Sequence, residues 1–175
     1  LKINFFVIGL FPSGGMRIIY EYANRLTLLG HDVILYAPYK PYSFLHNLNS
    51  SEFKLIMRML KNMLRKKDTV GLYENKFIVK YVPVLNNLFI RNADVNIATT
   101  WPTAYSLDKL SEDKGRKVHF IQDYEIWGAD AKLVDGSFNL KMKKITISKY
   151  NQKFFKDKFN IESEVILNGV DFSLY

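Results

Sequence analysis

The fold of this 175-residue chain is decided by the stretch Lys2-Ile-Asn-Phe-Phe-Val-Ile-Gly-Leu-Phe-Pro-Ser-Gly-Gly-Met-Arg-Ile-Ile-Tyr-Glu-Tyr-Ala-Asn-Arg-Leu26. Residues 3–10 form a short and nearly continuous apolar run, which is typical of a strand buried on both faces. Residues 12–15 interrupt that run, and from Met16 onward apolar residues recur every three or four positions, which predicts a helix. Residues 33–38 are the next apolar run, so the chain opens with a β-α-β unit.

Gly14 and Gly15 are expected to lie in the loop between this strand and this helix. Because glycine has no side chain, a ligand can approach the backbone closely there. The first turn of the helix would present N–H groups and the positive end of its dipole to an anion such as phosphate. The spacing is neither the Gly-x-Gly-x-x-Gly pattern of dinucleotide-binding folds nor a P-loop. A plain tight turn without a ligand therefore stays open as a second interpretation.

The composition is that of a folded chain with a substantial core, because 48% of the residues are hydrophobic and 15% are aromatic. The absence of cysteine excludes disulfides and thiolate metal sites, and the three histidines are too far apart in sequence to suggest metal ligands. Neither the cysteine nor the histidine content therefore indicates a metal site. The apolar runs are shorter than the roughly 20 residues of a membrane-spanning helix, and no signal peptide is recognised, so we expect a cytoplasmic protein.

The rest of the chain alternates between apolar runs of strand length and segments with helical spacing. Such alternation predicts an α/β fold with a doubly wound, mostly parallel sheet. We expect helices over residues 103–110 and 149–159, the second capped by Ser148, and we expect Gly30 to end the first helix with a positive φ. Further strands are expected at residues 77–85, 94–102, 117–125, 144–148 and 164–167.

Polar residues follow several of the predicted strands at the point where each strand ends. Ligands of doubly wound sheets bind beside the carboxyl ends of the strands, so these residues are expected to share one cleft. Their convergence carries more weight than any single motif. The residues concerned are Gly14, Gly15, Thr99, Thr100, Trp101, Gln122, Asp123, Tyr124, Glu125, Ser148, Asn168 and Gly169.

Three motifs, taken in order, resemble the family 4 glycosyltransferases of the GT-B fold. They are Gly14-Gly-Met-Arg17 with a helix and then Leu29-Gly-His-Asp-Val-Ile-Leu35, Ile145-Thr-Ile-Ser148, and Val165-Ile-Leu-Asn-Gly-Val-Asp171. The resemblance covers the whole chain and implies a Rossmann-like domain, the N-terminal half of a GT-B fold.

By this resemblance, residues 1–175 would be a single acceptor-binding domain, and residues 168–175 would lead into an absent C-terminal domain that binds the donor. The whole enzyme would move a sugar from a nucleotide-sugar to a glycan or lipid-linked acceptor with retention of configuration and without a metal. The chain alone would be inactive. Residues 122–125, Gln-Asp-Tyr-Glu, resemble the branch of the family that includes rhamnosyltransferases of surface polysaccharides.

The same resemblance implies roles for individual residues. Gly14 and Gly15 would approach the donor diphosphate. Gln122 and Asp123 stand where the family often has His-Asp and would be the catalytic pair. A glutamine cannot titrate and so cannot take an acid–base role of the family histidine, but its amide can still hydrogen-bond the transferred sugar. The acceptor would be bound by Arg17, Trp101 and Glu125.

Several alternatives stay open. Trp101 can stack on a sugar ring or pack at the edge of the hydrophobic core. Asp123 and Glu125 can simply be the solvent-exposed end of a strand. The chain can also be a non-catalytic sugar-binding or partner subunit. An NAD-type Rossmann domain is disfavoured because the third glycine is missing and no acidic residue ends the second strand at residues 36–38.

The net charge of +8 includes an asymmetric basic segment at residues 53–67. Its apolar residues fall on one face of a predicted helix, which is either an ordinary surface helix or one that docks on an anionic membrane. No pattern of interleaved aromatic and basic residues is present, so no nucleic-acid partner is expected. The basic stripe of this predicted helix consists of Lys54, Arg58, Lys61 and Arg65.

If the basic stripe docks the protein on a membrane, changing all four of its residues to Gln should abolish binding to vesicles rich in anionic lipid. The physical reason is that each basic side chain near such a surface contributes about 1 kcal/mol of attraction. Co-sedimentation of the full-length protein with anionic vesicles measures the effect, and neutral vesicles are the control. Binding that survives the fourfold substitution would show that the stripe does not dock the protein.

Overall fold

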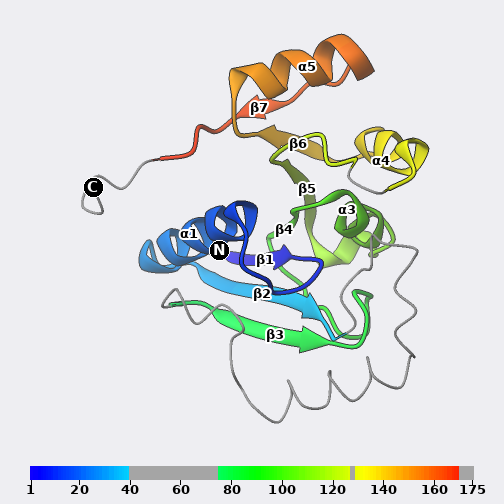
Figure 1. Ribbon diagram of the computed structural model, residues 1–175. Coiled ribbons are helices and arrows are strands. Elements are labelled where there is room, and N and C mark those ends of the chain that lie inside the picture. Colours follow the sequence, from blue (N-terminus) through cyan, green and yellow to red (C-terminus); the bar gives the residue numbers. More distant parts are fainter. Residues whose placement is uncertain (40–74, 127–128, 170–175) are drawn as a thin grey trace.

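The computed structural model of the protein describes residues 1–39, 75–126 and 129–169. In this part of the chain seven strands form one sheet of parallel neighbours, in the order β3-β2-β1-β4-β5-β6-β7 (Figure 1). The predicted doubly wound α/β sheet is confirmed. The strands are β1 (Lys2–Phe6), β2 (Asp32–Pro38), β3 (Ile78–Val82), β4 (Val95–Ala98), β5 (Arg116–Ile121), β6 (Lys143–Thr146) and β7 (Glu164–Val165). The helices are α1 (Gly14–Leu28), α3 (Trp101–Asp108), the 3₁₀ helix η1 (Glu112–Lys114), α4 (Ala131–Phe138) and α5 (Lys149–Phe159).

Both faces of the sheet are covered, as strand β1 shows residue by residue. Ile3, Phe5 and Val7 pack on one face against buried side chains of α1, whereas Phe6 packs on the other face in a cluster with side chains of α3. Successive side chains of a strand point to opposite faces, so a strand covered on both sides needs a continuous apolar run. A third cluster packs the end of β5 against α4 and α5.

Two helix boundaries were predicted correctly because local capping determines them. Helix α5 covers residues 149–159, and the Ser148 hydroxyl accepts a hydrogen bond from a backbone N–H of its first turn at 3.0 Å. Gly30 follows α1 with a φ of +85°. Its N–H bonds to the carbonyl of Thr27 at 3.0 Å, and the N–H of His31 bonds to the carbonyl of Leu26 at 3.1 Å, which is a Schellman motif.

The prediction that Gly14 and Gly15 lie in a loop was wrong, because both belong to the first turn of α1. Ser13 is the N-cap residue, and its hydroxyl accepts a hydrogen bond from the backbone N–H of Met16 at 3.1 Å. This cap starts the helix two residues before the apolar periodicity does, despite the low helix propensity of glycine.

Helix α3 also begins earlier than predicted, at Trp101, so the strand before it is shorter than expected. Pro102 is compatible with this start because the first turn of a helix needs no N–H donor there. Thr100 is the N-cap residue, and its backbone N–H donates to the Thr103 hydroxyl at 3.1 Å. The strand predicted at 94–102 accordingly ends at Ala98. The strand predicted at 117–125 is also too long, because β5 ends at Ile121 and the polar residues after it form a turn.

The basic segment predicted at residues 53–67, with Lys54, Arg58, Lys61 and Arg65, lies outside the described residues. Its helical form and its membrane docking therefore stay predictions. Among the residues that the structure describes, no helix combines the length and the apolar character needed to cross a bilayer.

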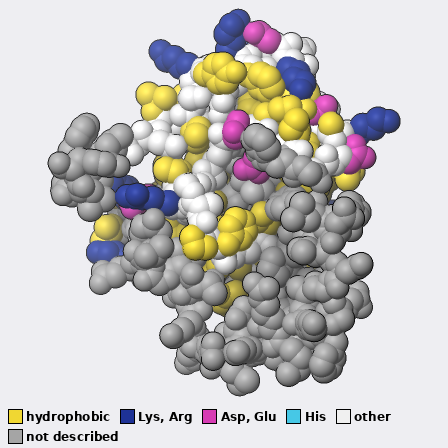
Figure 2. Space-filling model, viewed as in Figure 1, with side chains coloured by type: hydrophobic (Ala, Val, Ile, Leu, Met, Phe, Trp, Pro, Cys, Tyr) yellow, Lys and Arg dark blue, Asp and Glu magenta, His cyan; other side chains and the backbone are white. Residues whose placement is uncertain are grey.

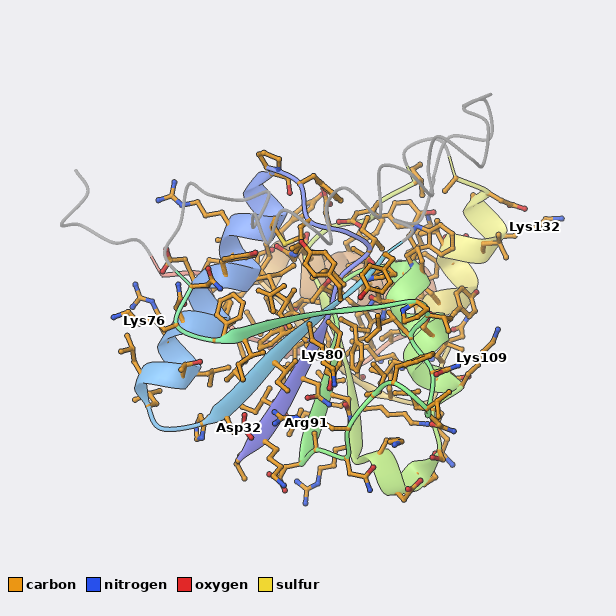
Figure 3. All side chains as sticks on the ribbon, turned by 90° about the horizontal axis from the view of Figure 1, so that it is seen from below. Asp32, Lys76, Lys80, Arg91, Lys109 and Lys132 are labelled. Atoms are coloured by element: carbon orange, nitrogen blue, oxygen red, sulfur yellow. The ribbon has the colours of Figure 1, made fainter. Side chains whose placement is uncertain are left out.

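A polar network ties the central strands together near their amino ends. The fully buried Asn4 of β1 donates to Asn96 Oδ1 at 2.8 Å, and its own Oδ1 accepts a hydrogen bond from Arg91 Nε at 3.0 Å. Arg91 also donates to the Asp32 carboxylate at 2.6 Å, and Figure 3 shows these two residues side by side. This hydrogen bond lowers the pKa of Asp32 below its usual value. The network therefore joins β1 to β4 through the two asparagines and β1 to β2 through Arg91.

Replacing Arg91 by Ala should lower the free energy of unfolding by about 1–3 kcal/mol, because the buried Asn4 oxygen loses its donor. The loss should be fully present at neutral pH and should shrink as the pH falls through the lowered pKa of Asp32, where its carboxylate becomes protonated. Denaturant unfolding at several pH values measures both effects. Lys109→Ala, at an exposed position that ends α3 (Figure 3), is the control, and equal stability of the two variants would contradict the network.

Candidate functional site

A pocket of about 560 Å³ lies at the carboxyl ends of the central strands. Strand β1 leads into α1 on one face of the sheet, whereas its neighbour β4 leads into α3 on the other face. The chain segments that leave these two strands therefore diverge and open a crevice between them, which is the usual ligand site of doubly wound sheets. The pocket is large enough for a small-molecule ligand.

Most of the residues predicted for the site line this one pocket. In the space-filling view, acidic side chains lie among hydrophobic and uncharged atoms, while Lys and Arg lie mostly toward the edges of the described surface (Figure 2). Arg17, Tyr124, Ser148 and Gly169 were also predicted for the site but are not among the lining residues. The predicted site residues that do line it are Gly14, Gly15, Thr99, Thr100, Trp101, Gln122, Asp123, Glu125 and Asn168.

The first turn of α1 forms one wall of the pocket. The N–H groups of Gly14 and Gly15 occupy the first two helical positions, so neither has a carbonyl one turn earlier in the helix to bond. A Cβ placed on Gly15 would lie 3.4 Å from both the oxygen and the nitrogen of the Gln122 amide, whereas one placed on Gly14 would meet no described atom within 4 Å. The backbone at Gly14 is thus open to a ligand, whereas a side chain at position 15 would be in van der Waals contact with the Gln122 amide.

The turn after β5 forms the opposite wall. The Gln122 carbonyl accepts a hydrogen bond from the Asn151 side chain of α5 at 2.8 Å, and Asp123 accepts one from the backbone N–H of Tyr124 at 2.8 Å. Tyr124 donates through its hydroxyl to Asp135 of α4 at 2.7 Å. Contacts from two helices therefore hold this turn in place and keep its carboxylates beside the pocket.

The pKa of the Glu125 carboxyl group is well above that of an ordinary glutamate. It is partly buried in the pocket wall, and burial raises its pKa to about 7, with a further contribution from the negative charge of Asp123. Asp123 itself is exposed. Near neutral pH the Glu125 carboxyl group can therefore be present in either form, which suits a group that accepts or donates a proton.

The start of α3 forms the floor of the pocket. Trp101 packs partly against the cluster that contains Val134 and Phe138, and it also lines the pocket. Its ring meets that of Tyr105 edge-on with centroids 6.3 Å apart, and the Tyr105 hydroxyl donates to the carbonyl of Leu133 at 2.8 Å. The two interpretations of Trp101 are thus compatible, because one side of the ring faces the core and another faces the pocket.

The pocket also has an apolar wall that was not predicted from the sequence, to which Ile8, Phe11, Ile18 and Ile147 contribute. A signal was present at Ile18, since it directly precedes the core residue Ile19 on the same helix and so cannot share its face. Among the described residues, no group of three or more histidine or acidic side chains is placed to hold a metal ion.

The different surroundings of the two glycines lead to a matched test. Gly15→Val should push the Gln122 amide out of position, whereas Gly14→Val should leave it in place, because only the first side chain meets that amide. The side-chain amide signal of Gln122 in NMR spectra measures the displacement. If both variants shift this signal equally, Gly15 and Gln122 do not pack as described.

No family model matches the sequence, and no curated protein matches it. Among solved structures, the fold is similar to that of an α-glucosyltransferase in complex with UDP and a 13-mer DNA containing an HMU base. The match has a TM-score of 0.60 and covers 97% of this chain, with 12% sequence identity. This chain spans 43% of the length of the glucosyltransferase chain. The two proteins therefore share the doubly wound α/β fold over nearly all of the present sequence.

Proposed function

We propose that this chain is the N-terminal, acceptor-binding domain of a glycosyltransferase that moves a sugar from a nucleotide-sugar to a glycan or lipid-linked acceptor with retention of configuration. The observation that carries the proposal is the pocket in which a helix N-terminus faces Gln122, Asp123 and Glu125. The similarity in fold to a glucosyltransferase that holds UDP supports it. The motif pattern of family 4, including the rhamnosyltransferase-like branch, supports the retaining mechanism.

The start of α1 would meet the diphosphate of the donor. The helix dipole and the N–H groups of Gly14 and Gly15 favour a negative charge at this wall. The open space at Gly14 lets phosphate oxygens approach the backbone. As the bond between the sugar and the diphosphate breaks, the charge that develops on the leaving group would be stabilised by this end of the helix.

The carboxylates on the opposite wall would bind the acceptor. In its ionised form Glu125 would accept a hydrogen bond from the acceptor hydroxyl that attacks the sugar, and Asp123 and the Gln122 amide would bind neighbouring sugar hydroxyls. Trp101 offers part of its ring to a sugar face. Arg17 lies on the same helix as Gly14 and Gly15 and would bind a longer acceptor.

The charge of the pocket favours an acceptor that is not a nucleic acid. None of the described residues that line the pocket is Lys or Arg, and two of them are acidic. A polyanionic backbone would be repelled there, since proteins bind nucleic-acid phosphates chiefly with basic side chains. The similar glucosyltransferase was solved with DNA, so we propose that the two differ in acceptor.

The donor would be bound mainly by a second domain that faces this pocket, as in other two-domain glycosyltransferases with this fold. The fact that this chain spans 43% of the similar glucosyltransferase is in keeping with such a division. No metal and no cofactor are needed in this proposal, because the helix N-terminus supplies the stabilising charge.

The proposal predicts that the full-length protein transfers sugar from one of a panel of nucleotide-sugars and that Glu125→Gln lowers kcat/KM by about 10- to 100-fold. This is the range expected when a hydrogen bond to a charged group is lost. Activity should rise with pH through about 7, where Glu125 ionises, and Asp123→Asn should move that rise to lower pH because it removes a neighbouring negative charge.

A radiolabel or mass-spectrometric transfer assay measures these effects. Glu112→Gln, at an exposed position in η1, is the matched control and should leave the pH profile unchanged. If the full-length protein binds sugars but transfers none from any donor, the result would instead identify a non-catalytic sugar-binding subunit.

A further inference from the structure

His119 is a buried polar residue whose hydrogen bonding is incomplete. It lies on β5 with 1% of its surface exposed, and its Nδ1 has no hydrogen-bond partner among the described residues. Its ring stacks on that of Phe138, with centroids 5.8 Å apart and an angle of 11° between the planes. His119 is thus buried like a core residue, but its Nδ1 is left without a partner among the described residues. Buried nitrogens of this kind are uncommon because leaving them unpaired is costly.

A small chamber connects this histidine with the candidate site. The chamber measures about 10 Å³, and both the His119 ring and Glu125 line it. It shares Glu125, Gln122, Thr99 and several other residues with the main pocket, so the two cavities adjoin. A cavity of this size holds about one water molecule, provided that polar groups surround it.

The polar groups around the chamber satisfy that condition. The Thr99 hydroxyl donates to the Phe6 carbonyl at 2.8 Å and therefore keeps lone pairs that can accept another hydrogen bond. Burial, assisted by the positive charge of Lys144 on β6, lowers the pKa of His119 to about 3, so the ring is neutral at physiological pH. A neutral imidazole carries one donor and one acceptor and can bind water in either role.

We infer that one buried water in this chamber links the His119 imidazole to the Glu125 carboxyl group, which makes His119 a positioning residue for that carboxyl. The inference deepens the proposed function and rests on it for the role of Glu125. The water accepts from or donates to the imidazole and donates to the Glu125 carboxylate, so that the carboxylate keeps its other oxygen for the acceptor hydroxyl. His119 itself touches neither substrate.

The link has a definite consequence for the ionisation of Glu125. A hydrogen bond donated to the carboxylate stabilises its ionised form, so losing the bond raises the pKa of Glu125. The other charged groups concerned are Asp123, which raises that pKa, and Lys144, which acts on His119. Both stay in place when His119 alone is changed, so the shift reports the water link.

The test uses full-length protein labelled with ¹³C at the glutamate carboxyl groups, in which NMR follows the titration of Glu125 and Glu125→Gln assigns its signal. His119→Phe keeps the ring stacking on Phe138 but removes both nitrogens, and it should raise the pKa of Glu125 by about one unit. His119→Gln keeps a polar group and should leave that pKa within a few tenths of a unit of the wild-type value.

Two outcomes would overturn the inference. An unchanged pKa in both variants would show that His119 does not act on Glu125, and an equal shift in both would show that packing alone is responsible. If His119→Phe does not fold, magnetisation transfer from a buried water to the His119 ring in the wild-type protein decides, because its absence would exclude the link. A confirmed link in a protein that transfers no sugar would refute only the proposed function, since the titration needs no substrate.

Discussion

The candidate site depends on two adjacent strands, β1 and β4, because the helices that follow them lie on opposite faces of the sheet. Strands β1 and β4 are paired up to Phe6 and Ala98, and just beyond this pair the Thr99 hydroxyl bonds to the Phe6 carbonyl at 2.8 Å. That bond holds the two strand ends together while α1 and α3 leave in different directions. The crevice is therefore a consequence of the strand order, and the turn after β5 completes its lining.

The two walls of the pocket have complementary electrostatic character. The positive end of α1 lies on one side, and Asp123 and Glu125 lie on the other, where burial and mutual repulsion raise the pKa of Glu125. In such a site the start of a helix can stabilise a leaving group that gains negative charge, and a carboxylate can bind a hydroxyl group that gives up its proton. This arrangement is what a transfer between a diphosphate and a hydroxyl requires.

The sequence allowed the order of strands and helices to be predicted, as well as the polar strand ends that meet in the pocket, because these depend on local periodicity and on caps such as Ser148 and Gly30. Gly14 and Gly15 were wrongly predicted to lie in a loop because glycine has a low helix propensity. In the structure the Ser13 cap determines the start of the helix, which therefore includes both glycines. The role of Ile8 in the pocket wall and the unpaired nitrogen of His119 depend on residues that are distant in sequence, so no local pattern could reveal them.

The most direct test of the account is a map of where the full-length protein binds nucleoside diphosphates, obtained from backbone amide shifts in NMR spectra during titration with UDP, GDP and dTDP. The account predicts saturable shifts at Gly14, Gly15 and Gln122 with at least one of these nucleotides, and none at Asp32 or Arg91 near the amino ends of the strands. Saturable shifts confined to Asp32 and Arg91, or no saturable shift at the start of α1 with any of the three, would contradict it.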